Sequence, residues 1–151
     1  MENENVNNII KLYFHSFDVF RKLEVTPRDF GSGDLLYQSE VHTLEVIGYN
    51  PGINLTGIAI KMDISKSAIS KFAKKLIDKK LIHKSSEQNN KKEVLFFLTP
   101  KGNTVFEGHQ TFEKNTFSGV YNLFDELTET EKAFLKKFFM ELINRINIHD
   151  C

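Results

Sequence analysis

The stretch "ISKSAISKFAKKLIDKKLIHK", residues 64–84, holds seven lysines among large apolar side chains, in a chain whose formal net charge is zero. Drawn as a helix at 100° per residue, it separates apolar from polar side chains. The apolar side holds Ile69, Phe72, Ala73 and Leu76. The other side holds Ser67, Ser70, Lys71, Lys74 and Asp78. We therefore expect a helix with one buried and one solvated face, capped by Ser65 and running to about Lys80.

The segments on either side of this helix indicate the motif to which it belongs. A shorter helix is predicted to begin at Asn54, a good N-cap, and to end at the three-residue break 63–65. Residues 81–84 and 93–98 are strand-like, and residues 86–92 between them are all polar. Two short helices followed by a hairpin with a lysine-bearing tip are typical of a winged helix-turn-helix.

The rest of the chain is predicted to be helical. Apolar residues at three- and four-residue steps predict a first helix to about Lys22, and a short helix follows from about Gln38, with Ser39 as a possible start. Thr99 and Pro100 open a helix through residues 106–123, and Thr128 and Glu131 form a capping box for a last helix. The fold class expected is α+β, mostly helical, with terminal helices outside the winged part.

Composition limits the function classes. A chain of 151 residues with 40% hydrophobic content can enclose one core. The single cysteine, Cys151, excludes a disulfide framework within the chain, and we expect it to be inert rather than a redox sensor. The chain shows no export leader and no apolar run of about 20 residues, so a cytoplasmic protein that does not span a membrane is expected. It also has no phosphate-binding glycine loop, G-x-S-x-G or HExxH motif, so an enzyme is not expected.

Charge is unevenly distributed along the chain. Residues 54–102 contain 11 lysines and four acids, whereas the remainder contains nine basic and 16 acidic residues. A basic helix beside a basic hairpin suits duplex DNA, because lysines neutralise phosphates and a helix fits the major groove. The predicted DNA contacts are Ser65, Lys66, Ser67, Ser70, Lys71, Lys74, Lys75, Asn90, Lys91 and Lys92, with Ser70 and Lys71 as base readers. The alternatives are a plain solvated helix face, or a winged-helix dimer that binds protein without reading DNA.

Three motifs resemble the multiple-antibiotic-resistance regulator (MarR) family of bacterial transcription factors. Residues 98–102, LTPKG, match its L-T-x-x-G after the wing; residues 55–59, LTGIA, match its l-t-x-l-A helix; and residues 80–82, KLI, match its G-L-I. The resemblance covers nearly the whole chain. It implies a homodimeric repressor on a pseudo-palindromic DNA operator, with one domain over residues 1–151. Dimerisation helices would span about 1–30 and 103–151, and the winged helix-turn-helix about 36–102. At the wing tip the family's acidic-then-arginine pair is replaced here by Asn90, Lys91 and Lys92, which favours phosphate contact over minor-groove insertion.

The input of such a regulator has several candidates. His109 and Glu113 lie four residues apart and would share a helix face. With His42 and Glu24 they resemble the ligand positions of the zinc-sensing branch of the family, although Glu113 replaces a histidine there. A small organic effector in a crevice between the two parts is an equal alternative. In a third interpretation His42 is hydrogen-bonded at the junction between the dimerisation and DNA-binding parts, and His109 is simply exposed.

Overall fold

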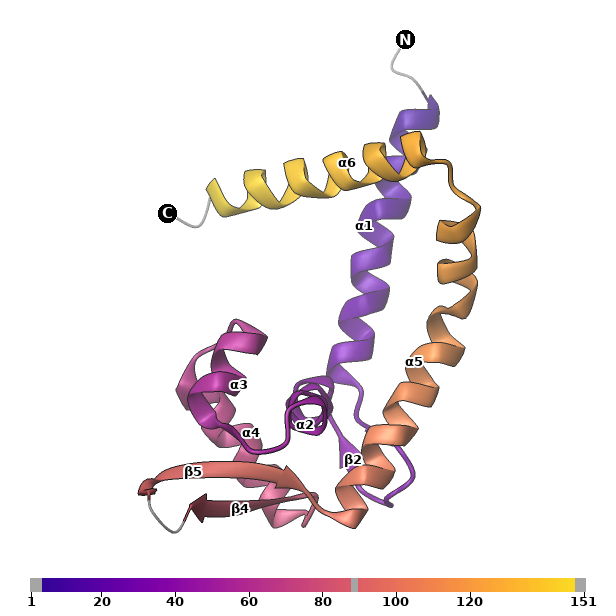
Figure 1. Cartoon of the computed structure of the whole chain (residues 1–151). Helices are drawn as coiled ribbons and strands as arrows, with labels where there is room; N and C mark the ends of the chain where they lie inside the picture. The colour runs from indigo at the N-terminus through magenta and orange to yellow at the C-terminus, as the bar shows by residue number, and fades with distance from the viewer. Residues whose placement is uncertain (1–3, 88–89, 149–151) are drawn as a thin grey trace. The chain divides into compact units, whose positions relative to one another are not determined.

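The computed structural model describes residues 4–87 and 90–148, and the chain divides into two compact units, Met1–Thr111 and Phe112–Cys151. None of the described helices is long and apolar enough to cross a membrane. The first unit contains α1 (Glu4–Val25), β1 (Arg28–Asp29), β2 (Leu35–Leu36), α2 (Gln38–Tyr49), β3 (Ile53–Asn54), α3 (Leu55–Met62), α4 (Lys66–Asp78), β4 (Ile82–Glu87) and β5 (Asn90–Leu98) (Figure 1). Helix α5 (Pro100–Glu126) begins in the first unit and ends in the second, which also contains α6 (Glu129–Ile148).

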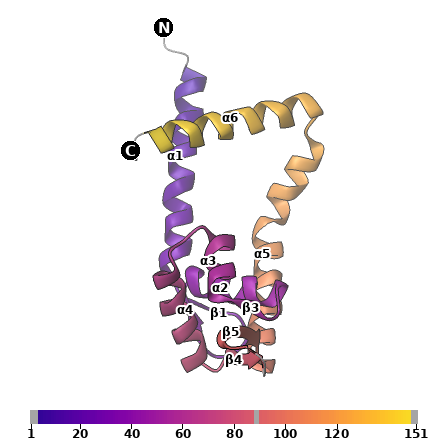
Figure 2. The same cartoon turned by 60° about the vertical axis from the view of Figure 1, so that its left-hand side comes forward.

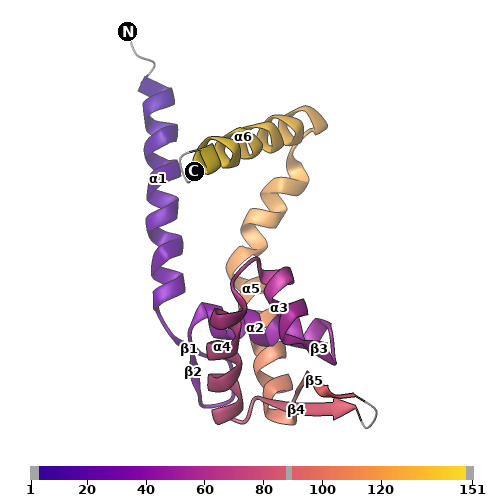
Figure 3. The ribbon, with the colours of Figure 1, turned by 90° about the vertical axis from the view of Figure 1, so that its left-hand side faces the viewer.

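The predicted helix-turn-helix and wing are present in the first unit. Helices α2, α3 and α4 are grouped side by side, with the β4–β5 hairpin at one end of the group (Figures 2 and 3). The wing is a three-stranded antiparallel sheet in the order β3-β5-β4, in which Ile53 pairs with Phe96 and Lys84 pairs with Phe96 from the other side. The α+β, mostly helical winged fold is therefore confirmed.

The strands differ from the prediction in two respects. Strands β4 and β5 continue to Glu87 and from Asn90, into the segment 86–92 that the sequence predicts to be loop. Antiparallel backbone pairing does not require apolar side chains where both faces of a hairpin meet water, so polar residues extend the ladder. Strand β3 and the small β1–β2 sheet have no counterpart in the prediction, because strands of two residues carry no readable alternation.

The core of the first unit is built from one face of each helix and from the sheet. The most deeply buried side chains include Leu44, Ile47, Ile58, Ile69, Leu76, Leu81, Phe96 and Val105. The predicted inner face of α4 is confirmed, since Ala73 is also buried and Phe72 is half-buried. Burial of these residues anchors α4 through one stripe and leaves its other face to solvent.

Three predicted helix starts in the first unit are confirmed by their capping contacts. The Asn54 side chain accepts from the Gly57 N–H at 2.8 Å, and the Ser65 hydroxyl accepts from the Ala68 N–H at 3.2 Å. Thr99 Oγ1 accepts from the Gly102 N–H at 3.0 Å. Each of these caps satisfies a backbone N–H group that has no partner within its helix.

The predicted capping box of the last helix is confirmed in the second unit. Glu131 accepts from the Thr128 N–H at 2.8 Å and donates its own N–H to Thr128 Oγ1 at 3.3 Å. Hydrogen bonds from the Thr128 side chain and backbone lower the pKa of Glu131. The start of α6 is therefore set by two residues that are three apart in the sequence.

Helix α2 begins at Gln38, as predicted, but Ser39 does not cap it. Its N-cap is Tyr37, whose backbone N–H donates to Glu40 Oε2 at 3.2 Å. The carboxylate three residues into the helix therefore satisfies the N–H of the capping residue, and no hydroxyl at Ser39 is needed.

Terminal helix surfaces contrast with this core. None of the described side chains of residues 112–145 is buried, and many of the apolar ones are strongly exposed. The exposed set on α5 and α6 includes Val120, Tyr121, Leu123, Phe124, Phe134, Phe138, Phe139 and Ile143. Helix α1 also exposes Ile9, Leu12, Phe14 and Phe20.

Candidate functional site

The outer face of α4 is open to solvent along its length. Ser67, Ser70, Lys71 and Lys74 are all exposed, as are Ser65 and Lys66 at the start of the helix. Ser65 Oγ lies 3.0 Å from Ser67 Oγ and also caps the helix, so its hydroxyl already has partners within the protein. The side chains that remain available in the middle of the helix are Ser70, Lys71 and Lys74.

A concave surface connects this face to the wing. A cavity of about 390 Å³ is lined by residues of α3, α4, β4 and β5, among them Ser70, Lys74 and Lys84. Lys84 is exposed on β4 and is not among the predicted contacts. Lys84 pairs with Phe96 of β5 and lines the same cavity as Ser70 and Lys74 of α4. The strand-like sequence pattern does not show that Lys84 lies close to α4.

The predicted contacts at the wing tip cannot be compared with described side chains. Asn90, Lys91 and Lys92 open β5, but their side chains lie outside the part of the structure that is described. Their role as phosphate contacts stays a prediction. The backbone of β4 and β5 places them at the far end of the hairpin from the core residues Ile82 and Phe96.

Lys75 has a partner inside the protein. Its ammonium lies 3.0 Å from Glu40 Oε1, and the ammonium of Lys79 lies 2.9 Å from Glu40 Oε2. The Glu40 side chain is 2% exposed. Burial raises the pKa of this carboxyl, but hydrogen bonds from Lys79, Lys75 and the Tyr37 backbone outweigh burial and leave the pKa lowered. Sequence reasoning missed this cluster, because its members come from α2 and α4.

The predicted metal ligands are brought together in part. One ligand atom each of His42, His109 and Glu113 lies within 4.8 Å of the others. The His42 and His109 rings meet edge to face at 5.5 Å between centroids, and Glu113 follows His109 by one turn of the continuous helix α5. Glu24 is exposed near the end of α1 and does not belong to this group in the described chain.

The expectation of an exposed His109 is wrong. Its side chain is 0% exposed, because the first half of α5 packs it against the Phe30 ring, at 5.1 Å between centroids, and beside His42. His109 Nδ1 lies 3.4 Å from Glu45 Oε1, and His42 Nε2 lies 2.7 Å from Gln38 Nε2. A carboxylate beside the second ring nitrogen, as Glu45 is beside His109, orients the rings of metal-binding histidines in proteins. The Gln38 amide instead donates an N–H to His42 Nε2.

The donor set suits zinc. Two imidazoles and a carboxylate are ordinary zinc ligands, and bonds of about 2.0–2.1 Å require ligand atoms roughly 3.3 Å apart in a tetrahedron. The separations within 4.8 Å need only side-chain adjustments to reach that geometry. Three protein ligands leave a fourth position for water or another donor.

Comparisons with known proteins settle the family. The sequence signature of the MarR family matches residues 36–94. An HTH-type transcriptional regulator of Bacillus subtilis (strain 168), YhjH, is 33% identical over 144 residues, which are 95% of this chain and 79% of YhjH. The chain belongs to the MarR family. It is a DNA-binding transcriptional regulator with a winged helix-turn-helix, as the sequence predicted.

Solved structures of another MarR-family protein are similar over almost the whole chain. Lactococcus lactis ZitR in complex with DNA matches with a TM-score of 0.76 and 26% identity, over 95% of this chain and 99% of that one. A crystal structure of ZitR described as a zinc-responsive MarR family member matches with a TM-score of 0.71 and 25% identity, over 93% of this chain and 99% of that one.

Proposed function

We propose that this MarR-family regulator acts as a homodimeric repressor, whose two α4 helices enter successive major grooves of a pseudo-palindromic operator. The observation that carries the proposal is the outer face of α4, where Ser70, Lys71 and Lys74 are exposed. A cavity lined by Ser70 and Lys74 leads from this face to the wing. Short hydroxyls and flexible cations can contact base edges and phosphates there. The similarity to ZitR, solved in complex with DNA, supports the same use of the fold.

The assigned roles follow position on the helix. Ser70 and Lys71, in the middle of α4, read base edges, and Lys66 and Lys74 contact phosphates together with Lys91 and Lys92 of the wing. Dimerisation uses the apolar surfaces of the terminal helices, about residues 1–30 and 103–151. Exposed apolar area of this extent on a soluble chain marks an interaction surface.

The DNA proposal is tested with a duplex selected from a random library by the wild-type protein. Lys71→Ala combined with Lys74→Ala should weaken binding of that duplex at least ten-fold. The slope of log affinity against log salt should decrease by about 0.9 for each phosphate that the variant no longer neutralises. Lys114→Ala combined with Lys136→Ala is the matched control, because it removes the same charge from exposed positions on α5 and α6. Equal affinity of both double variants would refute the assignment, and wild-type binding without salt dependence would favour the protein-binding alternative.

We further propose that zinc is the input, held by His42, His109 and Glu113. The convergence of these three side chains and the similarity to the zinc-responsive ZitR support it. When bound, the ion would supply a fixed link between α2 and α5. The protein's own contribution is to orient the His109 ring through the Glu45 carboxylate.

The metal proposal has a direct test. Zinc titrated into metal-stripped protein against a chromophoric chelator should reveal a tight site that is lost in His42→Ala and in His109→Ala. His15→Ala is the control, since His15 is exposed on α1. The same zinc addition should change the affinity for the selected duplex. A site that is indifferent to both histidines would refute the assignment and direct the search to organic effectors.

A further inference from the structure

Glu40 occupies an unusual place for a carboxylate. It lies in the first turn of α2 with 1% of its surface exposed, and the described chain pairs its two oxygens with the ammonium groups of Lys75 and Lys79 on α4. A buried carboxylate is tolerated in a protein interior when opposite charges and hydrogen bonds compensate for its lost hydration. Both lysines are therefore held by Glu40 at the flank of α4 that meets α2, and the Lys75 side chain is still 53% exposed there.

The two ion pairs of Glu40 fix both the position of α4 along α2 and its rotation about its own axis. Lys75 and Lys79 are four residues apart, so Glu40 holds two successive turns of the helix and sets its position along α2. Lys75 is also four residues beyond Lys71 and lies about 40° from it around the helix axis. A rotation of α4 that turned Lys71 toward or away from a DNA groove would pull Lys75 off Glu40.

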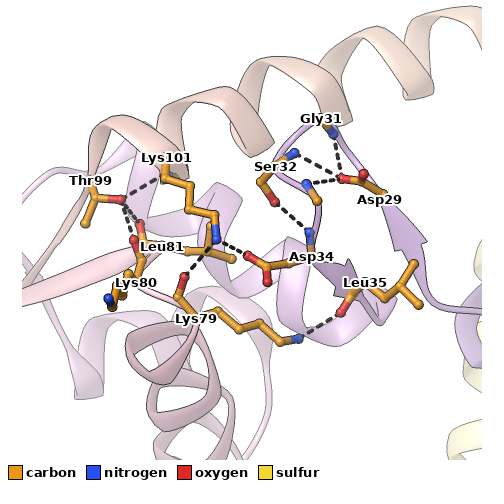
Figure 4. A network of polar contacts seen from close by, with 12 residues as sticks. Asp29, Gly31, Ser32, Asp34, Leu35, Lys79, Lys80, Leu81, Thr99 and Lys101 are labelled. Carbon is orange, nitrogen blue, oxygen red and sulfur yellow. Dashed lines mark hydrogen bonds and ion pairs between the residues drawn. The ribbon is translucent and has the colours of Figure 1, made fainter.

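Other contacts secure the end of the same helix. Lys79 Nζ also donates to the Leu35 carbonyl at 2.8 Å, and Lys101 Nζ donates to the Lys79 carbonyl at 3.4 Å (Figure 4). Thr99 Oγ1 donates to the Lys80 carbonyl at 2.7 Å. Figure 4 shows these contacts gathered around the last turn of α4, where β2 and the start of α5 meet it. The end of α4 is thus bonded to neighbouring elements on several sides, and Glu40 is the charge that joins it to α2.

We propose that Glu40 is a positioning residue for DNA recognition, which sets the rotation of α4 and withholds Lys75 and Lys79 from the phosphate backbone. This inference rests on the proposed DNA-binding function. It predicts that removal of the Glu40 charge weakens specific DNA binding, whereas electrostatics alone predicts that it strengthens binding. Removal of a negative charge near a DNA-binding surface ordinarily strengthens binding, whereas removal of a residue that positions the recognition helix weakens binding at the specific site.

The test compares Glu40→Gln with Asp78→Asn. Both remove one negative charge, and Asp78 is exposed on the outer side of α4. Dissociation constants are measured over a series of salt concentrations, for the duplex selected by the wild-type protein and for a scrambled duplex of the same composition. Glu40→Gln should bind the selected duplex at least ten-fold more weakly and the scrambled duplex as tightly or more tightly. Asp78→Asn should lose no affinity for either duplex. Wild-type or better affinity of Glu40→Gln for the selected duplex overturns the positioning role.

A second variant keeps the proposal testable where Glu40→Gln does not fold. Lys75→Met leaves Lys79 to neutralise Glu40. A positioning role predicts weaker binding of the selected duplex alone, with the salt slope unchanged. Weaker binding of both duplexes with a decreased slope would mean that Lys75 contacts phosphate directly, and would overturn the proposal.

Failure of the underlying function has a different signature. If the wild-type protein enriches no duplex from the random library, the proposed DNA readout fails and the positioning role fails with it. If the wild type enriches a duplex that Glu40→Gln still binds equally well, only the positioning role fails.

Discussion

The two halves of α5 differ sharply, although they form one helix. In the first half, Gly102, Val105 and His109 are buried by the first unit. In the second half, Tyr121 is 62% exposed and Leu123 is 64% exposed. The chain covers one half of the helix with its own side chains and leaves the apolar residues of the other half to water. A long helix can therefore belong to a self-sufficient core at one end and require a partner at the other.

Glycines on α5 mark the same division. A Cβ atom at Gly102 would collide with the backbone oxygen of Leu81, and one at Gly108 would collide with the backbone oxygen of Phe30. A Cβ at Gly119 would meet nothing within 4 Å. The first half is packed so closely that only glycine fits at two positions, whereas the second half of the described chain has room at Gly119.

The largest expected effect is on assembly. Leu123→Glu places a charge in the exposed apolar surface that we assign to the dimer, so sedimentation velocity at micromolar concentration should show monomers. Binding to the selected duplex should fall by about a hundred-fold or more, because two linked half-site contacts become one. Asn122→Glu is the control, since it adds the same charge at a neighbouring exposed polar position. A Leu123→Glu protein that stays dimeric would show that no second copy covers this surface.

The next largest effect is on the free energy of unfolding. Glycine-to-alanine substitutions should lower it in the first half of α5 and raise it in the second half. Gly102→Ala should destabilise the protein by about 1–3 kcal/mol, because backbone rather than a flexible side chain must move. Gly119→Ala should stabilise it by about 0.5–1 kcal/mol through a smaller loss of chain entropy. Urea unfolding of both variants measures the two changes. Changes of the same sign would contradict the contrast between the halves.

The smallest effect concerns Lys80, the second residue after α4. Lys80 has φ +58°, a left-handed conformation that side chains with a Cβ adopt at a cost. Lys80→Gly should therefore raise the free energy of unfolding by about 0.5–1 kcal/mol. Lys74→Gly, within regular helix, should lower it by about 1 kcal/mol. Thermal unfolding of the two variants gives the comparison, and a destabilised Lys80→Gly would show that its side chain compensates for the strain.

Local chemistry explains which parts of the fold were predictable. The caps at Asn54, Ser65 and Thr99 depend on atoms within three residues of each other, so the sequence alone identifies them. The outer face of α4 follows from a helical period in the same way. The pairing of Glu40 with Lys79 joins residues 39 apart, and no local pattern indicates which acid faces which lysine.

The group of His42, His109 and Glu113 was predictable in part from the sequence. The spacing of His109 and Glu113 predicts a shared helix face, but their meeting with His42 depends on how α2 and α5 pack. The resemblance to a zinc-sensing branch supplied that information for three of the four residues. It did not supply the burial of His109, which results from its contacts with Phe30 and His42.

The strand order of the wing has a consequence for synthesis. Strand β5 is the middle strand of the sheet, yet it is the last of the three to be made. On the ribosome, β3 and β4 both lack their neighbour until residue 98 has emerged, even though α3 and α4 can already be helical. A nascent chain arrested before β5 should therefore hold its recognition helix without a wing, and should be cleaved by protease in the segment 82–87.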